Sequence, residues 1–174
     1  MRSHANVTIA ALVAIAGLVV VAGAAGDKVA FPENYAKGVL YWVQDRPANK
    51  QVREYYTSRE AIEAARKGAP LPAGTVITVV QYNTQVDAQG NAVTDANGRF
   101  IRTDIRGYTA MEKRRGWGTE YPENLRNGEW EYQSFTVNKT ANTNADLNAC
   151  FTCHKKQEKM DFVFSYENLK TAGN

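Results

Sequence analysis

Two cysteines and a histidine stand together near the end of the chain, in the pentapeptide CFTCH at residues 150–154. They include both cysteines of the 174 residues, and the only other histidine is His4. A C-x-x-C-H motif is typical of covalent haem attachment, in which the thiols bind the vinyl groups and the histidine ligates iron. One helical turn brings both sulfurs to the same side, so the motif also requires a helix. We expect one covalently attached haem c, with Cys150 and Cys153 as the attachment sites and His154 as the iron ligand.

The first residues have the pattern of an export signal. Arg2 is followed by an uncharged stretch from Ala5 to Gly26, with small residues at positions 22–24. A basic start, an apolar run and a small-residue cleavage site are typical of a secretory signal peptide. We therefore expect residues 1–24 to be a signal peptide and the mature protein to be periplasmic. The alternative is an uncleaved membrane anchor, because about 20 apolar residues are enough to cross a bilayer.

Two other kinds of site use closely spaced cysteines. A thioredoxin-like redox pair follows a strand in a βαβ pattern and does not need an adjacent histidine. A zinc site needs four ligands, and the chain after the leader has no second Cys or His pair to complete the set. Covalent haem is the interpretation that uses all three residues of the motif.

The rest of the chain, residues 25–174, is expected to form a single domain, since one core suffices for roughly 100 to 200 residues. Its charge is nearly balanced: the whole chain has 21 Lys and Arg against 18 Asp and Glu, and Arg2 leaves with the leader. The basic residues are also dispersed along the sequence. This distribution argues against a nucleic-acid partner, which would need a concentrated positive surface.

The group on the other side of the iron decides what a haem protein does. His4 lies in the leader, which excludes ligation by two histidines within one mature chain. Met160 follows His154 by six residues and is expected near the helix that carries this histidine. Met111 then remains as the thioether that could complete a His/Met pair, although core packing is the commoner role of methionine. We expect Met111 in the core and an open distal site.

Three segments have the pattern of strands, which excludes an all-helical bundle. GTVITVVQYNTQV (74–86) is rich in β-branched residues, and GRFIRTDIRGYTAMEK (98–113) alternates after an Asn-Gly turn. GEWEYQSFTVNK (128–139) places Trp130, Tyr132 and Ser134 on one face and Glu131, Gln133 and Phe135 on the other. Residues 87–97 are rich in turn formers and are expected to join the first two of these strands as a long hairpin loop.

Helical patterns are short. In TSREAIEAARKG (57–68), Thr57 and Glu60 have the spacing of a capping box, and Gly68 is the expected stop. A second helix is expected to begin near Asn144, carry the haem motif and end before Asp161. The apolar segment DFVFSYENL (161–169) is expected to be extended and to pack under the haem. The predicted fold class is α+β: an antiparallel β-sheet with a few short helices, and a haem-binding helix near the C-terminus.

The order of these segments resembles the cytochrome P-460 family, which also contains the cytochromes called c-prime-beta. The resemblance covers about residues 32–169. Its specific parts are PAGTV (72–76), the Gly116-Trp117-Gly118 turn and DFVF (161–164) after the haem motif. It implies a β-sheet haem protein, usually a homodimer, whose proximal ligand is His154 and whose distal face is lined by sheet and loop side chains.

The resemblance also separates two branches of the family. Members that oxidise hydroxylamine have a strand lysine bound to the porphyrin, and the corresponding position here is Val79. No lysine stands between Lys67 and Lys113, which puts hydroxylamine chemistry in doubt. The branch without the cross-link implies an open, apolar distal pocket, here with Val79, that binds nitric oxide and related small ligands.

Arg102 and Arg106 are candidate partners of the haem propionates, because guanidinium pairs bidentately with carboxylate. Both arginines are explained equally well as outward-facing strand residues that contact only solvent. Three functions remain open: a haem protein that binds nitric oxide, a periplasmic electron carrier with an unidentified redox partner, and an enzyme that oxidises hydroxylamine or a related nitrogen compound.

Overall fold

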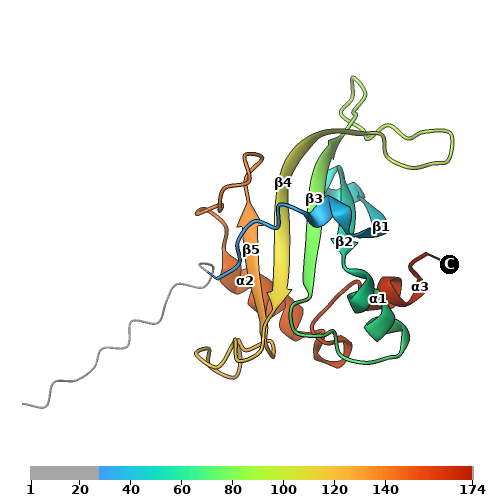
Figure 1. Ribbon diagram of the computed structural model, residues 1–174. Coiled ribbons are helices and arrows are strands. Elements are labelled where there is room, and N and C mark those ends of the chain that lie inside the picture. The colour runs from blue at the N-terminus through green and yellow to red at the C-terminus, as the bar shows by residue number, and fades with distance from the viewer. Residues whose placement is uncertain (1–27, 174) are drawn as a thin grey trace, which may run out of the picture.

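A computed structural model of the chain describes residues 28–173. The predicted signal peptide, with His4, lies outside these residues. The described chain is built on one antiparallel sheet of five strands, which lie in the order β1-β2-β3-β4-β5. The strands are β1 (Val39–Arg46), β2 (Gln51–Thr57), β3 (Val76–Thr84), β4 (Arg102–Lys113) and β5 (Trp130–Phe135). This architecture, with its short helices, confirms the α+β prediction (Figure 1).

The two faces of the sheet carry separate clusters of buried side chains. Ile77, Met111 and Tyr132 belong to one cluster, which also contains side chains from all three α-helices; we call this side the helix face. Val80, Tyr108 and Phe135 belong to the other cluster, and we call that side the tyrosine face. Successive residues of a strand point to opposite faces, so the alternation predicted for 128–139 is confirmed by Tyr132 and Phe135. In Figure 1 the N-terminal segment crosses in front of the sheet, on the tyrosine face, and α2 lies behind β5.

Helix α1 (Arg59–Arg66) packs against the C-terminal helix α3 (Tyr166–Thr171). The N-cap of α1 is Ser58, whose hydroxyl accepts from the Ala61 N–H. The predicted capping box from Thr57 is therefore wrong by one residue. The Thr57 hydroxyl instead donates to the Val76 carbonyl at 2.8 Å, which ties the end of β2 to β3.

The haem motif lies on α2 (Leu147–Lys155), which is followed by the 3-10 turn η3 (Glu158–Met160). The helix is shorter than predicted at both ends. Asp146 caps its start by accepting from the Asn148 and Ala149 N–H groups, and Lys156 is its C-cap. The prediction that 161–169 is extended is wrong. Asp161 and Phe162 have left-handed backbone conformations, with φ of 51° and 62°, and α3 begins at Tyr166.

Two further 3-10 turns, η1 (Tyr35–Lys37) and η2 (Pro47–Asn49), flank β1. The predicted loop between β3 and β4 is present and projects from one end of the sheet (Figure 1). It contains the isolated bridges Val86–Ala92 and Thr94–Phe100. Arg99, at its end, donates to the Asp45 carboxylate on β1 at 2.7 Å.

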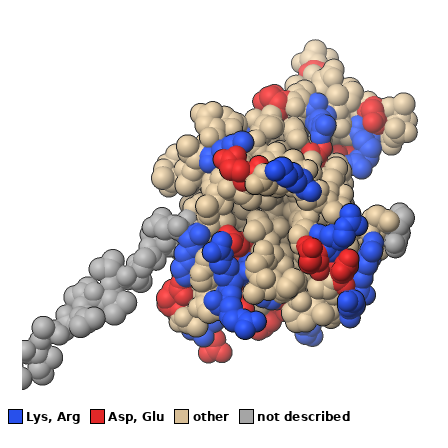
Figure 2. Space-filling view, in the orientation of Figure 1, with Lys and Arg blue, Asp and Glu red and all other residues tan. Residues whose placement is uncertain are grey.

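Lys and Arg side chains form groups at the lower left and at the right of the face shown in Figure 2, and Asp or Glu side chains lie beside each group. Among residues 28–173, the structure contains no helix long and apolar enough to cross a membrane.

Candidate functional site

The helix that carries the haem motif presents one thiol outward and one inward. Cys153 is exposed, whereas Cys150 is half-buried and packs against the core cluster of the helix face. Burial, followed by the nearby Asp146 and Cys153, raises the pKa of the Cys150 thiol. A raised pKa is the opposite of what a redox-active pair needs, since the thiolate is the nucleophile.

His154 is held as a neutral imidazole with a defined tautomer. Its Nδ1 lies 2.7 Å from the Phe162 carbonyl oxygen, which is an acceptor, so Nδ1 carries the proton and donates it. Burial lowers the pKa of His154, partly opposed by this hydrogen bond. Nε2 therefore has the lone pair that a metal ligand needs, and the carbonyl provides the outer hydrogen bond that fixes the ring of a metal-bound histidine.

The imidazole lies between two aromatic rings. The Tyr132 ring is 4.7 Å away on β5, and the Phe164 ring is 5.1 Å away in an edge-to-face arrangement. Tyr132 is buried, but Phe164 is 51% exposed, which is unusual for a phenylalanine. An exposed ring beside the imidazole is apolar surface that a flat macrocycle would cover.

The loop after η3 is fixed by a nearly buried ion pair. The Lys113 ammonium, at the end of β4, donates to both carboxylate oxygens of Asp161 at 2.8 and 2.9 Å. The Leu71 N–H also donates to Asp161, at 2.8 Å. The DFVF segment is thus tied to the sheet at the residue that precedes Phe162.

Val79 lies on β3, on the side of the sheet that carries the helix-face cluster, and its predicted role in the site stays a prediction. It is two residues from Ile77 on β3, so it points to the helix face, and it is half-buried. Its cross-strand neighbours are Tyr55 on β2 and Thr109 on β4, and Thr109 is in turn opposite Ser134 on β5. We call these four residues, with Arg53 and Gln44, the sheet wall.

Arg53 was not predicted from the sequence as a site residue. It lies two residues from Tyr55 on β2 and pairs with Gln44 and Gln81, so it also points to the helix face. Its Nε atom is buried and has no hydrogen-bond partner in the described structure. If β2 had been predicted as a strand, Gln51, Arg53 and Tyr55 would have been expected on one face, and Arg53 would have been a candidate.

Tyr55 and Gln44 add further polar groups to the sheet wall. The Tyr55 hydroxyl donates to the Gln44 side-chain oxygen at 2.9 Å. Burial raises the pKa of Tyr55, and the adjacent Arg53 opposes this effect. The expected apolar pocket is therefore only partly right, since Val79 lies beside a polar cluster.

Met111 is buried, with 7% of its surface exposed, and belongs to the core cluster of the helix face. It is the cross-strand neighbour of Tyr132, the residue whose ring contacts His154. Met160 packs against the same cluster from η3. Both sulfurs thus lie among core side chains, as expected for methionines used in packing.

The two arginines that were predicted as propionate partners are both exposed. Arg102 pairs with Glu54 and lies over the Tyr82 ring at 5.0 Å, on the tyrosine face. Arg106 is exposed at an irregularity in β4, where Gly107 and Ile105 pair with β3 and Arg106 does not. The role predicted for Arg106 stays a prediction.

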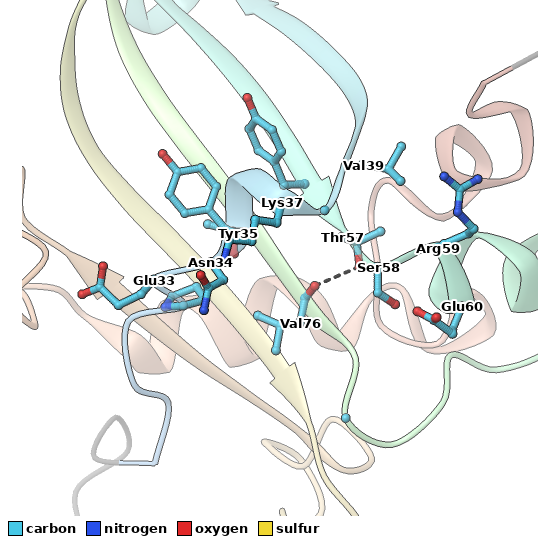
Figure 3. A pocket seen from close by; sticks show the side chains of 15 residues that line it. Glu33, Asn34, Tyr35, Lys37, Val39, Thr57, Ser58, Arg59, Glu60 and Val76 are labelled. Carbon is cyan, nitrogen blue, oxygen red and sulfur yellow. Dashed lines mark hydrogen bonds between the residues drawn. The ribbon is translucent and has the colours of Figure 1, made fainter.

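A hollow of about 550 Å³ lies on the tyrosine face, between η1 and the start of α1 (Figure 3). Tyr35, Val76 and Arg59 are among the side chains that line it. It is wide open to solvent and is separated from His154 by the sheet. It does not belong to the site around α2.

Residues 32–165 match the sequence model of the cytochrome P460 family. The chain belongs to this family. A search of curated proteins found no match to the chain. Membership in the cytochrome P460 family, which the resemblance predicted, makes the protein a haem-binding cytochrome.

The residues around His154 fit a haem group. Within residues 28–173, no three His, Cys, Asp or Glu side chains converge as a self-contained metal cage would require. A single neutral imidazole beside exposed apolar surface is instead the donor set that a haem needs, because the porphyrin supplies the other iron ligands. Cys150 and Cys153 lie one turn apart on the same helix, as thioether attachment requires.

Proposed function

We propose that this member of the cytochrome P460 family is a mono-haem c-type cytochrome that binds nitric oxide, or a related small nitrogen oxide, at an open distal face. Cys150 and Cys153 form thioethers with the porphyrin, and His154 Nε2 ligates the iron. The sheet wall around Val79 forms the distal side. The haem iron supplies the ligand-binding and redox chemistry.

The observation that carries this proposal is the composition of the sheet wall. Its six residues, Gln44, Arg53, Tyr55, Val79, Thr109 and Ser134, include no histidine, methionine or lysine. Tyr55 is a phenol whose pKa is raised by burial and whose hydroxyl already donates to Gln44, so it stays protonated and is a poor iron ligand. With Met111 in the core, no residue of this wall competes with an external ligand for the sixth position.

The chain's own residues have separate tasks in this scheme. His154 holds its proton at Nδ1, on the Phe162 carbonyl, and so presents Nε2 to the iron. Val79 occupies the centre of the wall and limits the size of the ligand. Arg53 offers a buried, unpartnered donor that suits a haem propionate or the oxygen of a bound ligand.

The polar cluster also supports a second function. Arg53 and Tyr55 are donors that can orient a polar substrate, and distal hydrogen-bond donors favour activation over simple binding. Oxidation of hydroxylamine or a related compound therefore remains the alternative, although Val79 stands in place of the cross-linking lysine. An electron-transfer role is the third candidate, and it requires a sixth ligand from outside the sheet wall.

We further propose that the protein is exported to the periplasm and forms a homodimer, as its family implies. Its redox partner is a protein of unidentified type. Nitric oxide is a diffusible gas, so the proposal requires no docking of a macromolecular substrate.

The test is the visible spectrum of the ferrous, haem-loaded protein before and after addition of nitric oxide. We expect a five-coordinate, high-spin spectrum that changes on mixing. A low-spin spectrum that is insensitive to nitric oxide would replace the ligand-binding proposal with the electron-transfer one. Turnover of hydroxylamine with an electron acceptor, measured on the same sample, distinguishes binding from catalysis.

A further inference from the structure

We propose that Lys113 and Asp161 are positioning residues for the iron ligand. Their ion pair fixes the direction of the Phe162 carbonyl and thereby sets the hydrogen bond that this carbonyl accepts from His154. The inference rests on the proposed role of His154 as the haem ligand.

The first observation is that the Asp161 carboxylate accepts three hydrogen bonds. It accepts two bonds from the Lys113 ammonium and one from the Leu71 N–H. The side chains of Lys113 and Asp161 are only 11% and 12% exposed. An ion pair with so little solvent contact has one preferred geometry, unlike an exposed pair whose long side chains move freely.

The second observation is the backbone that the carboxylate holds. Asp161 and Phe162 are adjacent non-glycine residues with φ of 51° and 62°. Asp161 is the C-cap of η3, where Asp tolerates the left-handed region, but this region is unfavourable for Phe162, so surrounding contacts must support it there. The loop is also closed by the Phe162 N–H, which donates to the Gln157 carbonyl at 2.8 Å. If the Asp161 side chain loses its partners, the backbone of these two residues should shift toward more favourable φ values.

The third observation is the proximity of the anchor to the hydrogen bond. The carbonyl in question belongs to Phe162, the second of the two left-handed residues. Its oxygen lies 2.7 Å from His154 Nδ1. A change at Asp161 φ or Phe162 φ reorients the chain that bears this carbonyl. Lys113 thus affects the orientation of the Phe162 carbonyl, which accepts the imidazole hydrogen bond, although Lys113 does not contact the imidazole.

The anchor also fixes the site relative to the sheet wall. Lys113 ends β4, which carries Thr109, and Leu71 lies on the segment that leads into β3, which carries Val79. Asp161 binds both, so the proximal loop is joined to the strands on which the distal residues lie. The Asp161 carboxylate therefore contributes to the distance between His154 and the wall, together with the packing of Tyr132 against the imidazole.

The expected effect is electronic. A strong Nδ1–H hydrogen bond increases the basicity of a metal-bound imidazole and favours the ferric state. Weakening the bond makes the imidazole a poorer ligand, which lengthens the iron–histidine bond and favours the ferrous state. Loss of the ion pair should therefore lower the iron–histidine stretching frequency and raise the midpoint potential.

The experiment compares haem-loaded Lys113→Met and Asp161→Asn with wild type by resonance Raman spectroscopy of the ferrous protein and by redox titration. Asp161→Asn is the milder change, because the amide oxygen can still accept from the Leu71 N–H, and it decides the matter if Lys113→Met does not fold. Lys113→Arg keeps the charge and should restore both readouts. Lys139→Met, which breaks the exposed Lys139–Glu33 pair, is the matched control and should change neither.

A lower iron–histidine frequency and a more positive potential in both variants, with rescue by Lys113→Arg, support the inference. Unchanged frequency and potential in a variant that only unfolds at lower temperature overturn it, because the pair is then merely structural. Failure of the proposed function has a different signature: the wild type itself would show no iron–histidine stretch.

Discussion

His154 and Phe162 are joined by a hydrogen bond of 2.7 Å from the ring Nδ1 to the backbone carbonyl, although eight positions separate them. The bond connects the haem motif to the DFVF segment that distinguishes the family resemblance. It gives that segment a physical role, since its carbonyl selects the imidazole tautomer that leaves Nε2 for iron.

Replacing the two thiols tests covalent attachment. Cys150→Ser and Cys153→Ser should each retain one thioether and carry covalent haem at reduced yield, whereas the double variant should lose haem on extraction with acidified acetone. Mass spectrometry of the extracted protein measures the result. Thr152→Ser, between the cysteines on the same helix, is the control and should keep its haem. Covalent haem in the double variant would refute attachment at these residues.

The sequence predicted β3, β4 and β5 because their residues alternate or are β-branched, but it did not reveal β1 and β2. The reason is the chemistry of β2. Glu54 lies on the tyrosine face, where it is buried and accepts from the hydroxyls of Tyr56 and Tyr82 at 2.9 and 3.1 Å. Arg53 lies on the opposite face. Both faces of β2 thus carry charge, and the alternation that identifies a half-buried strand is hidden.

The C-x-x-C-H motif could be recognised in the sequence because it is local, whereas its surroundings depend on tertiary contacts. The left-handed conformation of Asp161 and Phe162 could not be anticipated, since non-glycine residues adopt it only where other contacts impose it. The Lys113 ammonium, 48 positions away in sequence, binds the Asp161 carboxylate, which is a contact that the sequence does not reveal. Val79 lies on the helix face, and its role in the site stays a prediction, whereas its polar neighbour Arg53 was missed together with β2.

The size of residue 79 should control access to the iron. Val79→Ala enlarges the space at the centre of the wall and should speed nitric oxide association, while Val79→Phe should slow it. A change of about tenfold corresponds to roughly 1.4 kcal/mol in the barrier. Stopped-flow mixing with the ferrous protein measures both rates. Val137→Phe, at an exposed loop position, is the control. Equal association rates in both Val79 variants would show that Val79 does not lie on the distal side of the haem.

Acid should weaken the contact between the β3–β4 loop and β1. The hydrogen bond from Arg99 is the main reason that the pKa of Asp45 lies below its usual range, and the Phe100 N–H adds to this effect. A lowered folded-state pKa gives stability that is present above the unfolded pKa of about 3.9 and lost as the pH falls through the folded value. Asp45→Asn should therefore cost up to about 1 kcal/mol near pH 6, and this cost should shrink as the pH falls through the folded-state pKa of Asp45.

Urea unfolding of wild type and Asp45→Asn across this pH range measures the difference. Arg99→Met should produce the same pH dependence, because it removes the other half of the pair. A difference that stays constant with pH would show that the Asp45 carboxylate is not responsible.

The Gly116-Trp117-Gly118 turn contains two glycines with similar φ, 85° and 86°, but different surroundings. A Cβ at Gly116 would meet nothing within 4 Å, whereas one at Gly118 would collide with the Gly128 carbonyl. Gly116→Ala should thus cost only the left-handed conformation, about 1–2 kcal/mol. Gly118→Ala should cost more, because a backbone atom cannot move aside. Thermal unfolding of the two variants gives the comparison, and equal losses would contradict the proposed collision.

Arg53 should have different effects on the protein without and with haem. In the described structure its buried Nε has no partner, and such a group costs about 1–3 kcal/mol. Arg53→Met removes that cost together with the 3.3 Å hydrogen bond from Arg53 Nη2 to the Gln51 side chain, so the haem-free protein should lose little or no stability. If Arg53 pairs with a propionate when haem is present, the same substitution should destabilise the haem-loaded protein. Urea unfolding of both forms measures this difference. Gln81→Met, at the neighbouring position on β3, is the control, and destabilisation of both forms by Arg53→Met would show that Arg53 supports the fold rather than the haem.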